Sequence, residues 1–183
     1  MSSNGAAPSN LEAVLKLAAR VYVSRSWPVL PLYRIVDGRC NCGRKEGDDC
    51  TPGKHPRTSS GLSEASIDLA VIDEWFSRWP ESNLAILTGA ASGLVVVDVD
   101  PKHGGLKSIK ELTGSDVPGE AWGTKMIQRT GSGGFHLLYA HPDKTVRNRV
   151  GLWDGIDVKA DGGYILAAPS NHLSGGVYEW LRL

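Results

Sequence analysis

Long apolar runs are absent from this sequence of 183 residues. No stretch approaches the roughly 18 consecutive apolar residues that a membrane-spanning helix requires, so we expect no membrane partner. Residues Met1 to Asn10 are small and polar, and they lack the basic and then apolar pattern of a secretory signal. We therefore expect a cytoplasmic protein in which residues 1–9 form a disordered leader.

The sequence also lacks a net charge, because 20 Lys and Arg residues balance 20 Asp and Glu residues. This balance argues against a protein that only coats DNA by charge, although a local basic patch still suffices to bind nucleic acid. Cysteine is scarce, and its three copies fall between Cys40 and Cys50. Without a secretory signal, such a cluster favours a metal site over disulfides.

Glycine, by contrast, is abundant with 22 copies, and proline has 10, which is typical of a strand-rich chain with many tight turns. We predict one α+β domain over residues 10–183 with a mixed or antiparallel sheet. Residues 37–61 are polar and Gly-rich and form an expected insertion. Apolar periodicity predicts helices at 10–24, 69–79 and 105–112. Strands are predicted at 28–33, where prolines suggest a sheet edge or strand ends, and at 84–87, 94–100, 125–129, 136–140, 155–159, 164–168 and 177–180.

Two acidic residues, Asp98 and Asp100, close the most apolar of these strands. Side chains alternate along a strand, so both carboxylates project from one face. Such a pair stays ionised around a divalent cation and suits two-metal phosphoryl transfer. The plainer alternative is that both residues cap turns. The position of Asp98 between Val97 and Val99 favours the metal site, because an unpaired carboxylate is costly there.

The segment Thr130-Gly-Ser-Gly-Gly-Phe-His136 is a glycine-rich turn that leads into a strand. Glycines allow backbone N–H groups to approach an anion closely, and His136 could donate to a phosphate. The segment is not a Walker loop, because no Gly-Lys-Ser/Thr follows. Taken alone, it fits an ordinary hairpin with a surface histidine better.

A third carboxylate, Asp157, lies on the strand Gly155-Ile-Asp-Val-Lys159. Alternation places Lys159 on the same face. Asp157 could complete a metal site and Lys159 could meet phosphate charge. In isolation, the two residues fit a surface ion pair better.

The cysteines form the pattern Cys40-x-Cys42-x₇-Cys50-x₄-His55. Three sulfurs and one nitrogen make a full tetrahedral set for structural Zn²⁺. The loop around them is polar, so metal would supply the folding energy that burial cannot. Three unrelated free cysteines are the alternative, which their clustering disfavours. Basic residues nearby could give the loop a face for template or primer: Arg44, Lys54 and Arg57.

Taken in order, these segments resemble the prim-pol family of bifunctional DNA primase/polymerases, which are archaeo-eukaryotic-type primases of phages, plasmids and mobile elements. The matching sequence motifs span nearly the whole chain. Besides the motifs above, it includes Trp27-Pro-Val-Leu-Pro-Leu32, Gly53-Lys-His-Pro-Arg57, Trp79-Pro80, Asn83-Leu-Ala-Ile86 and the segment from Asp161 to Ser170.

The resemblance implies a two-lobed α+β fold, with one lobe similar to an RNA-recognition-type sheet. It implies that two Mg²⁺ or Mn²⁺ ions bind Asp98, Asp100 and Asp157. It also implies that His136 contacts the incoming triphosphate, with Ser132, Gly133 and Gly134 beside it. Further candidates for phosphate or template contacts are Lys102, Lys159 and His172. Lys159 stands where the family often has Arg, and keeps the charge without the planar fork.

We therefore expect template-directed nucleotidyl transfer, with DNA primase and DNA polymerase activity. The expected partners are a single-stranded DNA template, a primer, NTPs or dNTPs, and a fused or associated helicase. The chain would be the N-terminal part of a longer replication protein.

Two alternatives stay open. One is a metal-dependent nuclease or phosphodiesterase, which would use the same carboxylates with water as the nucleophile. The other is a non-catalytic, zinc-stabilised DNA-binding module of a replication initiator, whose DNA binding would survive loss of all three carboxylates.

Overall fold

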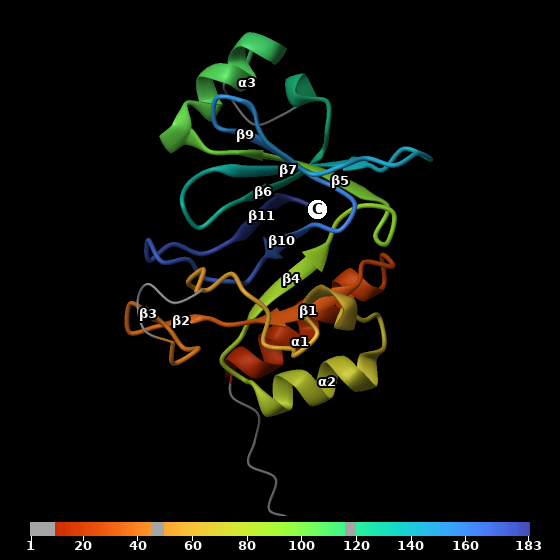
Figure 1. The fold of residues 1–183 in the computed structure, drawn as a ribbon, viewed down its shortest axis with the longest axis vertical. Helices are drawn as coiled ribbons and strands as arrows, with labels where there is room; N and C mark the ends of the chain where they lie inside the picture. Colours follow the sequence, from red (N-terminus) through yellow and green to blue (C-terminus); the bar gives the residue numbers. More distant parts are fainter. Residues whose placement is uncertain (1–9, 45–49, 116–119) are drawn as a thin grey trace, which may run out of the picture.

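The computed structural model describes residues 10–44, 50–115 and 120–183. The expected leader (1–9) and part of the expected insertion (45–49) lie outside the described residues. The described chain is α+β, as predicted, with antiparallel sheets throughout. Figure 1 shows helices at both ends of the molecule with the strands between them.

A three-stranded sheet forms one part of the fold, in the order β1 (Val29–Leu32), β4 (Asn83–Leu87) and β10 (Tyr164–Ala167). Two helices, α1 (Asn10–Val23) and α2 (Leu69–Arg78), pack beside it. Alternate strand residues such as Leu84 and Ile86 join the apolar faces of these helices in one core. The intervening residues face a second cluster that contains Leu166 and Tyr178.

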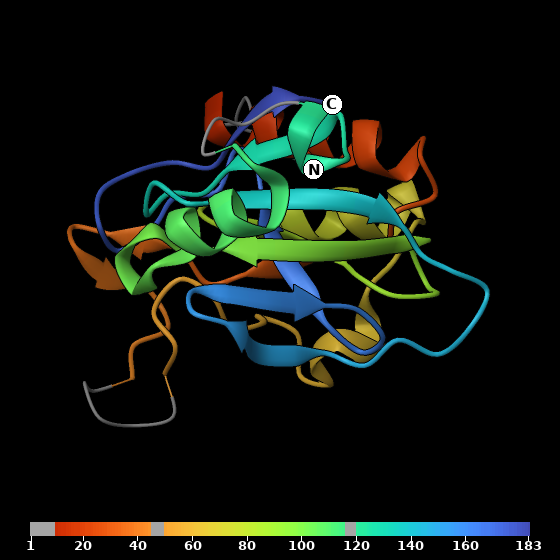
Figure 2. The ribbon, with the colours of Figure 1, turned by 90° about the horizontal axis from the view of Figure 1, so that it is seen from above.

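A six-stranded sheet forms the other part. Its order is β11 (Glu179–Arg182), β6 (Met126–Arg129), β7 (Phe135–Ala140), β5 (Leu94–Val99), β9 (Ile156–Lys159) and β8 (Arg149–Trp153). The helix α3 (Gly105–Thr113) contributes Ile109 to a core on one face, together with Val99 and Leu137. Figure 2 shows α3 lying over the strands of this sheet.

The opposite face of the six-stranded sheet turns toward the three-stranded one. Val96 and Leu138 of this face belong to the same core as α1 and β4. Asp98 lies two residues beyond Val96 on β5, so it shares that face. The alternation therefore places Asp98 where the two sheets approach each other.

The described chain also contains a small hairpin of β2 (Ile35–Val36) and β3 (Arg39–Cys40). It has three short 3₁₀ helices as well, which are η1 (Gly61–Glu64), η2 (Pro101–His103) and η3 (Glu120–Trp122). Strands β2, β3 and β8 lie outside the predicted strands, and β11 begins two residues later than predicted. Of the two positions that the prolines suggested for this segment, the structure shows the edge: β4 is the one strand that pairs with β1, and Pro31 lies inside β1. Among the described residues, no helix is long and apolar enough to span a bilayer.

Candidate active site

Four side chains form a row across adjacent strands of the six-stranded sheet. Gln128 of β6 is opposite His136 of β7. His136 is opposite Asp98 of β5, and Asp98 is opposite Asp157 of β9. Directly opposed residues project from the same face of an antiparallel sheet. The register therefore gathers residues from four separate segments of the sequence into one line.

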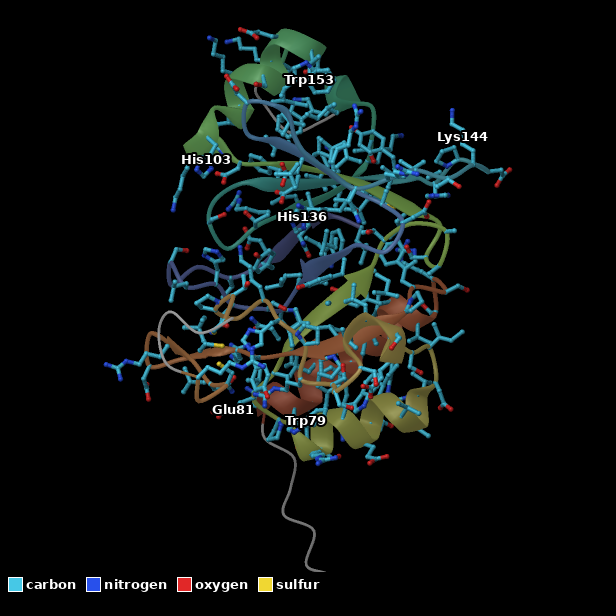
Figure 3. The ribbon with its side chains drawn as sticks, in the orientation of Figure 1. Trp79, Glu81, His103, His136, Lys144 and Trp153 are labelled. Atoms are coloured by element: carbon cyan, nitrogen blue, oxygen red, sulfur yellow. The ribbon has the colours of Figure 1, made fainter. Side chains whose placement is uncertain are left out.

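This row faces a pocket of about 400 Å³ between the two sheets. Asp98, His136 and Lys159 line it from the six-stranded sheet, and Tyr164 to Leu166 line it from β10. Thr51 and Lys54 come from the cysteine-bearing loop. Figure 3 shows His136 in the middle of the molecule, between the two groups of strands. Charged groups of both signs thus share one concave space, as a polar ligand requires.

His136 is held by a buried glutamine. The Gln128 Oε1 atom accepts from the Ala168 N–H at 2.8 Å, and Gln128 Nε2 donates to the Leu166 carbonyl at 2.8 Å. These two partners fix which end of the amide is which. The second Nε2 hydrogen therefore faces His136 Nδ1, also at 2.8 Å, so Nδ1 accepts and carries no proton.

The neutral imidazole consequently carries its proton on Nε2. This atom lies 3.8 Å from Asp98 Oδ1, which is too long for a hydrogen bond, so its proton is available to another acceptor in the pocket. Burial lowers the pKa of His136, which the Asp98 charge raises and the Lys159 and Lys54 charges lower further. His136 is therefore a neutral hydrogen-bond donor near pH 7.

The negative charge of Asp157 is balanced by contacts from β9 and β8. Its carboxylate accepts from Lys159 Nζ at 2.9 Å and from the Gly151 N–H at 2.8 Å. Burial alone would raise the pKa of Asp157, but these contacts hold it below the ordinary value. Asp98, directly opposite, is 30% exposed at its side chain. Lys159 thus offsets part of the repulsion between two facing carboxylates.

Asp100 occupies a different setting from Asp98. Its carboxylate accepts from the Lys102 N–H at 2.9 Å and lies 2.7 Å from His103 Nδ1. Burial acts to raise the pKa of Asp100, but His103 and Lys102 lower it overall. Asp100 thereby caps η2, which is the turn-capping role that the sequence left open as an alternative. In this arrangement both of its oxygens are already occupied.

The Gly-rich segment is the hairpin between β6 and β7. The N–H groups of Gly133 and Gly134 bind Thr130, through its carbonyl at 2.9 Å and its hydroxyl at 2.9 Å, and Ser132 Oγ lies 3.0 Å from the same hydroxyl. A Cβ on Gly134 would lie 2.3 Å from the Val99 carbonyl. The hairpin thus holds β7 against β5 and fixes the start of the strand that carries His136.

Lys102 and His172, the remaining candidates for phosphate or template contacts, lie close to Asp100 and Lys54. Burial lowers the pKa of His172, and the charges of Lys54 and Lys102 lower it further, whereas that of Asp100 raises it. These four groups therefore lie within electrostatic range of one another. The pocket lining itself does not include Lys102 or His172.

The cysteine-bearing loop can hold a metal ion. Ligand atoms of Cys40, Cys42, Cys50 and His55 all lie within 4.8 Å of one another, and the sulfurs of Cys42 and Cys50 are 3.5 Å apart. His55 Nδ1 donates to the Thr51 carbonyl at 2.9 Å. Its Nε2 is buried and has no hydrogen-bond partner among the described residues. A metal-binding imidazole has this arrangement, with one nitrogen oriented by a carbonyl and the other free.

In the described part of the chain, this cluster is the one group of at least three His, Cys, Asp or Glu ligands that gathers so closely. Asp98 and Asp157 are neighbours across two strands, and Asp100 turns toward His103. The structure therefore presents one carboxylate that lines the pocket, that of Asp98, with Asp157 opposite it on the next strand and Asp100 engaged nearby.

Two residues of the site were missed by the sequence reasoning. Gln128 has one visible signal, which is a polar side chain between Ile127 and Arg129 on a predicted apolar strand. Lys54 was assigned to a general basic face, but it lines the pocket. Arg57, expected on the same face, instead bonds the Leu32 and Glu81 carbonyls, so its guanidinium stabilises the loop.

Comparison with known proteins finds one matching family model. The family model described as "Bifunctional DNA primase/polymerase, N-terminal" matches residues 19–183. The search of curated proteins gives no match. The matched range contains the whole row of β6, β7, β5 and β9 and the cysteine-bearing loop.

Proposed function

Because the chain belongs to the bifunctional DNA primase/polymerase family over residues 19–183, we propose that residues 10–183 catalyse template-directed transfer of nucleotides to a DNA primer. Family membership implies a nucleotidyltransferase-type enzyme with DNA and nucleotide substrates. The proposal extends to primase and polymerase activity in phage, plasmid or mobile-element replication, with a fused or associated helicase. It also equates the six-stranded sheet with the RNA-recognition-type lobe of the family.

One observation carries the proposal: Asp98 lies between His136 and Asp157 on adjacent strands, beside the pocket. A carboxylate pair and a neutral donor on one face can serve metal-assisted phosphoryl transfer. Mg²⁺ and Mn²⁺ prefer few carboxylates combined with substrate phosphates, and Asp98 and Asp157 meet this requirement. Asp100 would become a third carboxylate for the cations if its side chain released His103.

Each residue of the row then has a role. Asp98 and Asp157 hold the cations, and Lys159 keeps Asp157 ionised. His136 donates its Nε2 proton to a triphosphate oxygen, while Gln128 maintains the required tautomer. Ser132, Gly133 and Gly134 shape the wall at the start of β7, and Lys102 and His172 supply outer contacts to phosphate or template. Two bound divalent ions would activate the primer 3′-hydroxyl and stabilise the leaving pyrophosphate.

The template and primer path is proposed along β8. This edge strand is exposed at Arg149, at Val150 and at Trp153, a residue that is 48% exposed. Its Gly151 N–H binds Asp157, so nucleic acid bound at this edge would lie beside that carboxylate. Arg149 and Trp153 are paired with Val158 and Ile156, so they project from the face of the sheet that α3 covers. Exposed arginine and tryptophan side chains suit a phosphate backbone and stacked bases.

Zn²⁺ is the proposed occupant of the Cys₃His cluster, because three thiolates and one imidazole form its usual closed tetrahedral set. Burial and the neighbouring sulfurs of Cys42 and Cys40 raise the pKa of Cys50 to about 12. A metal would displace this thiol proton on binding. Zinc binding is therefore expected to weaken as the pH falls.

Primer extension on a DNA template with Mn²⁺ tests the function. Asp98→Asn should lose at least about 100-fold in rate, since the charge that holds the cations is removed. Asp143→Asn, an exposed change outside the row, should keep the wild-type rate. Wild-type extension by Asp98→Asn would remove the core of the proposal. Cutting of labelled DNA without triphosphates would instead favour a nuclease, and DNA binding without either activity would favour the non-catalytic module.

A further inference from the structure

The Cys₃His cluster and the pocket share one short segment of chain. Cys50 and His55 are two of the four cluster ligands. Thr51 and Lys54, which line the pocket, lie between them in sequence. Two of the metal ligands and part of the pocket wall therefore belong to a single turn, residues 50–55.

Both sides of this turn are anchored. On the cluster side, the Gly53 N–H lies 3.4 Å from Cys40 Sγ, and His55 Nδ1 donates to the Thr51 carbonyl. On the pocket side, the Tyr164 hydroxyl donates to the Lys54 carbonyl at 2.6 Å, and Asn83 Nδ2 donates to the Gly53 carbonyl at 2.9 Å. The backbone around Lys54 is thus fixed relative to Cys40 on one side and to β4 and β10 on the other.

Lys54 is also the more available of the two lysines that line the pocket. Lys159 is paired with Asp157 at 2.9 Å, whereas Lys54 forms no ion pair with a described residue. The positive charge of Lys54 acts on both histidines of this region: it lowers the pKa values of His136 and His172 in addition to the effect of burial. Lys54 and His136 line the same pocket, so an anionic ligand beside His136 would share that pocket with the Lys54 ammonium.

We infer that Lys54 binds the triphosphate of the incoming nucleotide, and that metal in the Cys₃His cluster holds Lys54 in position, so that loss of the metal weakens nucleotide binding. This inference rests on the proposed function and adds a role for the cluster beyond folding. The described residues of the loop around the cluster are mostly exposed or half-buried. Metal ligation would therefore add a constraint on residues 50–55 to the ring and backbone contacts that His55 makes with Tyr33.

A double-mutant cycle on nucleotide affinity tests both parts. The full chain is titrated calorimetrically with a non-hydrolysable deoxynucleoside triphosphate and Mg²⁺, and bound zinc is measured for each variant. Lys54→Met should weaken binding about tenfold, which corresponds to ~1.4 kcal/mol. Lys144→Met, an exposed lysine that Figure 3 shows on the projecting 140–149 arm, should leave affinity unchanged.

Cys42→Ser should lose zinc and weaken nucleotide binding by a similar factor. Combining it with Lys54→Met should add little further loss, because the two changes disable the same contact. If Cys42→Ser does not fold, removal of zinc from the wild-type and Lys54→Met proteins by a thiol-specific chelator provides the same comparison. Zinc removal should then weaken binding by the wild type and change binding by Lys54→Met little.

Three outcomes would overturn the inference. They are unchanged affinity in Lys54→Met, unchanged affinity after zinc loss, and fully additive losses in the double variant. Failure of the wild-type protein to bind any nucleoside triphosphate is a different result, which would contradict the proposed function itself.

Discussion

At the scale of single residues, the arrangement around His136 depends on Gln128. The backbone of β10 and the residue after it fix the Gln128 amide at both ends, and the amide then fixes the imidazole tautomer. Protonation of Nδ1 would place two donors against each other, which adds to the effect of burial on the His136 pKa. A glutamine that touches no substrate can therefore determine which nitrogen serves the pocket.

Replacing Gln128 by Glu should raise the pKa of His136. A carboxylate facing Nδ1 accepts its proton and favours imidazolium. Titration of the histidine ring signals by NMR measures this directly. His172 serves as an internal control, because its ring bonds Ser174 rather than Gln128. A His136 titration unchanged from the wild type would show that the amide does not set its protonation.

The depressed pKa of His136 also predicts a pH dependence of stability. The unfolded chain takes up this proton near the ordinary value of 6.5, whereas the folded chain does so at lower pH. The stabilisation is therefore complete above pH 6.5 and declines as the pH falls toward the folded-state pKa, by at most ~1.4 kcal/mol per pH unit. Denaturation without Mg²⁺ or Mn²⁺ should show a shallower acid slope for His136→Asn. Equal slopes would exclude the effect.

Sequence patterns predicted which residues belong to the site better than they predicted the contacts between those residues. Asp98, His136 and Asp157 were selected from strand alternation and the resemblance, and the register brings them together. The capping of η2 by Asp100 uses the adjacent Lys102 and His103 and was one of the two roles that the sequence left open. The contacts of Gln128 with Leu166 and Ala168 join segments far apart in sequence. No periodicity could reveal them.

At the scale of elements, two glycines fix the end of β5. The Asp100 N–H donates to the Gly155 carbonyl at 2.7 Å, and the Gly105 N–H donates to the Asp100 carbonyl at 2.8 Å. A Cβ on Gly155 would lie 2.4 Å from the Gly105 nitrogen. The β8–β9 turn, the end of β5 and the start of α3 therefore pack as close as backbones allow.

Gly155→Ala should accordingly destabilise the fold. Gly93→Ala is the matched control, because Gly93 has a similar positive φ but open space around its Cβ position. The control should lose roughly 1–2 kcal/mol from the left-handed backbone, and Gly155→Ala should lose at least about 2 kcal/mol more from overlap. Urea denaturation compares them, and equal losses would show that the close approach is not required.

Most elements were predictable, but β8 was not. Helices and buried strands have clear apolar patterns, and their boundaries agree within about two residues. Strand β8 is exposed along almost its whole length, contains a left-handed Gly151 and pairs irregularly with β9. An edge strand of this kind needs no apolar face, so its sequence resembles a loop.

At the scale of the whole molecule, the site is formed by the approach of two sheets. The pocket takes its carboxylate and histidine from one sheet, apolar walls from the other and Lys54 from the cysteine-bearing loop. The sequence indicated the α+β class and the metal ligands. It could not show that the loop reaches the pocket, because a polar insertion carries no signal of the surface it covers.

The proposed DNA path along β8 predicts a separation of two binding functions. Trp153→Ala should weaken binding of single-stranded DNA by about 1–3 kcal/mol through lost stacking, while triphosphate affinity stays unchanged. Trp153→Phe should restore most of the DNA binding. Fluorescence anisotropy with labelled oligonucleotides measures both variants. Wild-type DNA affinity in Trp153→Ala would place the strand elsewhere.

The most direct measurement of the central claim is the anomalous scattering of Mn²⁺ in a crystal of the protein bound to a non-hydrolysable nucleoside triphosphate. The account predicts a peak within about 2.2 Å of oxygens from Asp98 and Asp157, with the triphosphate also contacting His136 Nε2. Manganese and triphosphate bound away from this row would contradict it.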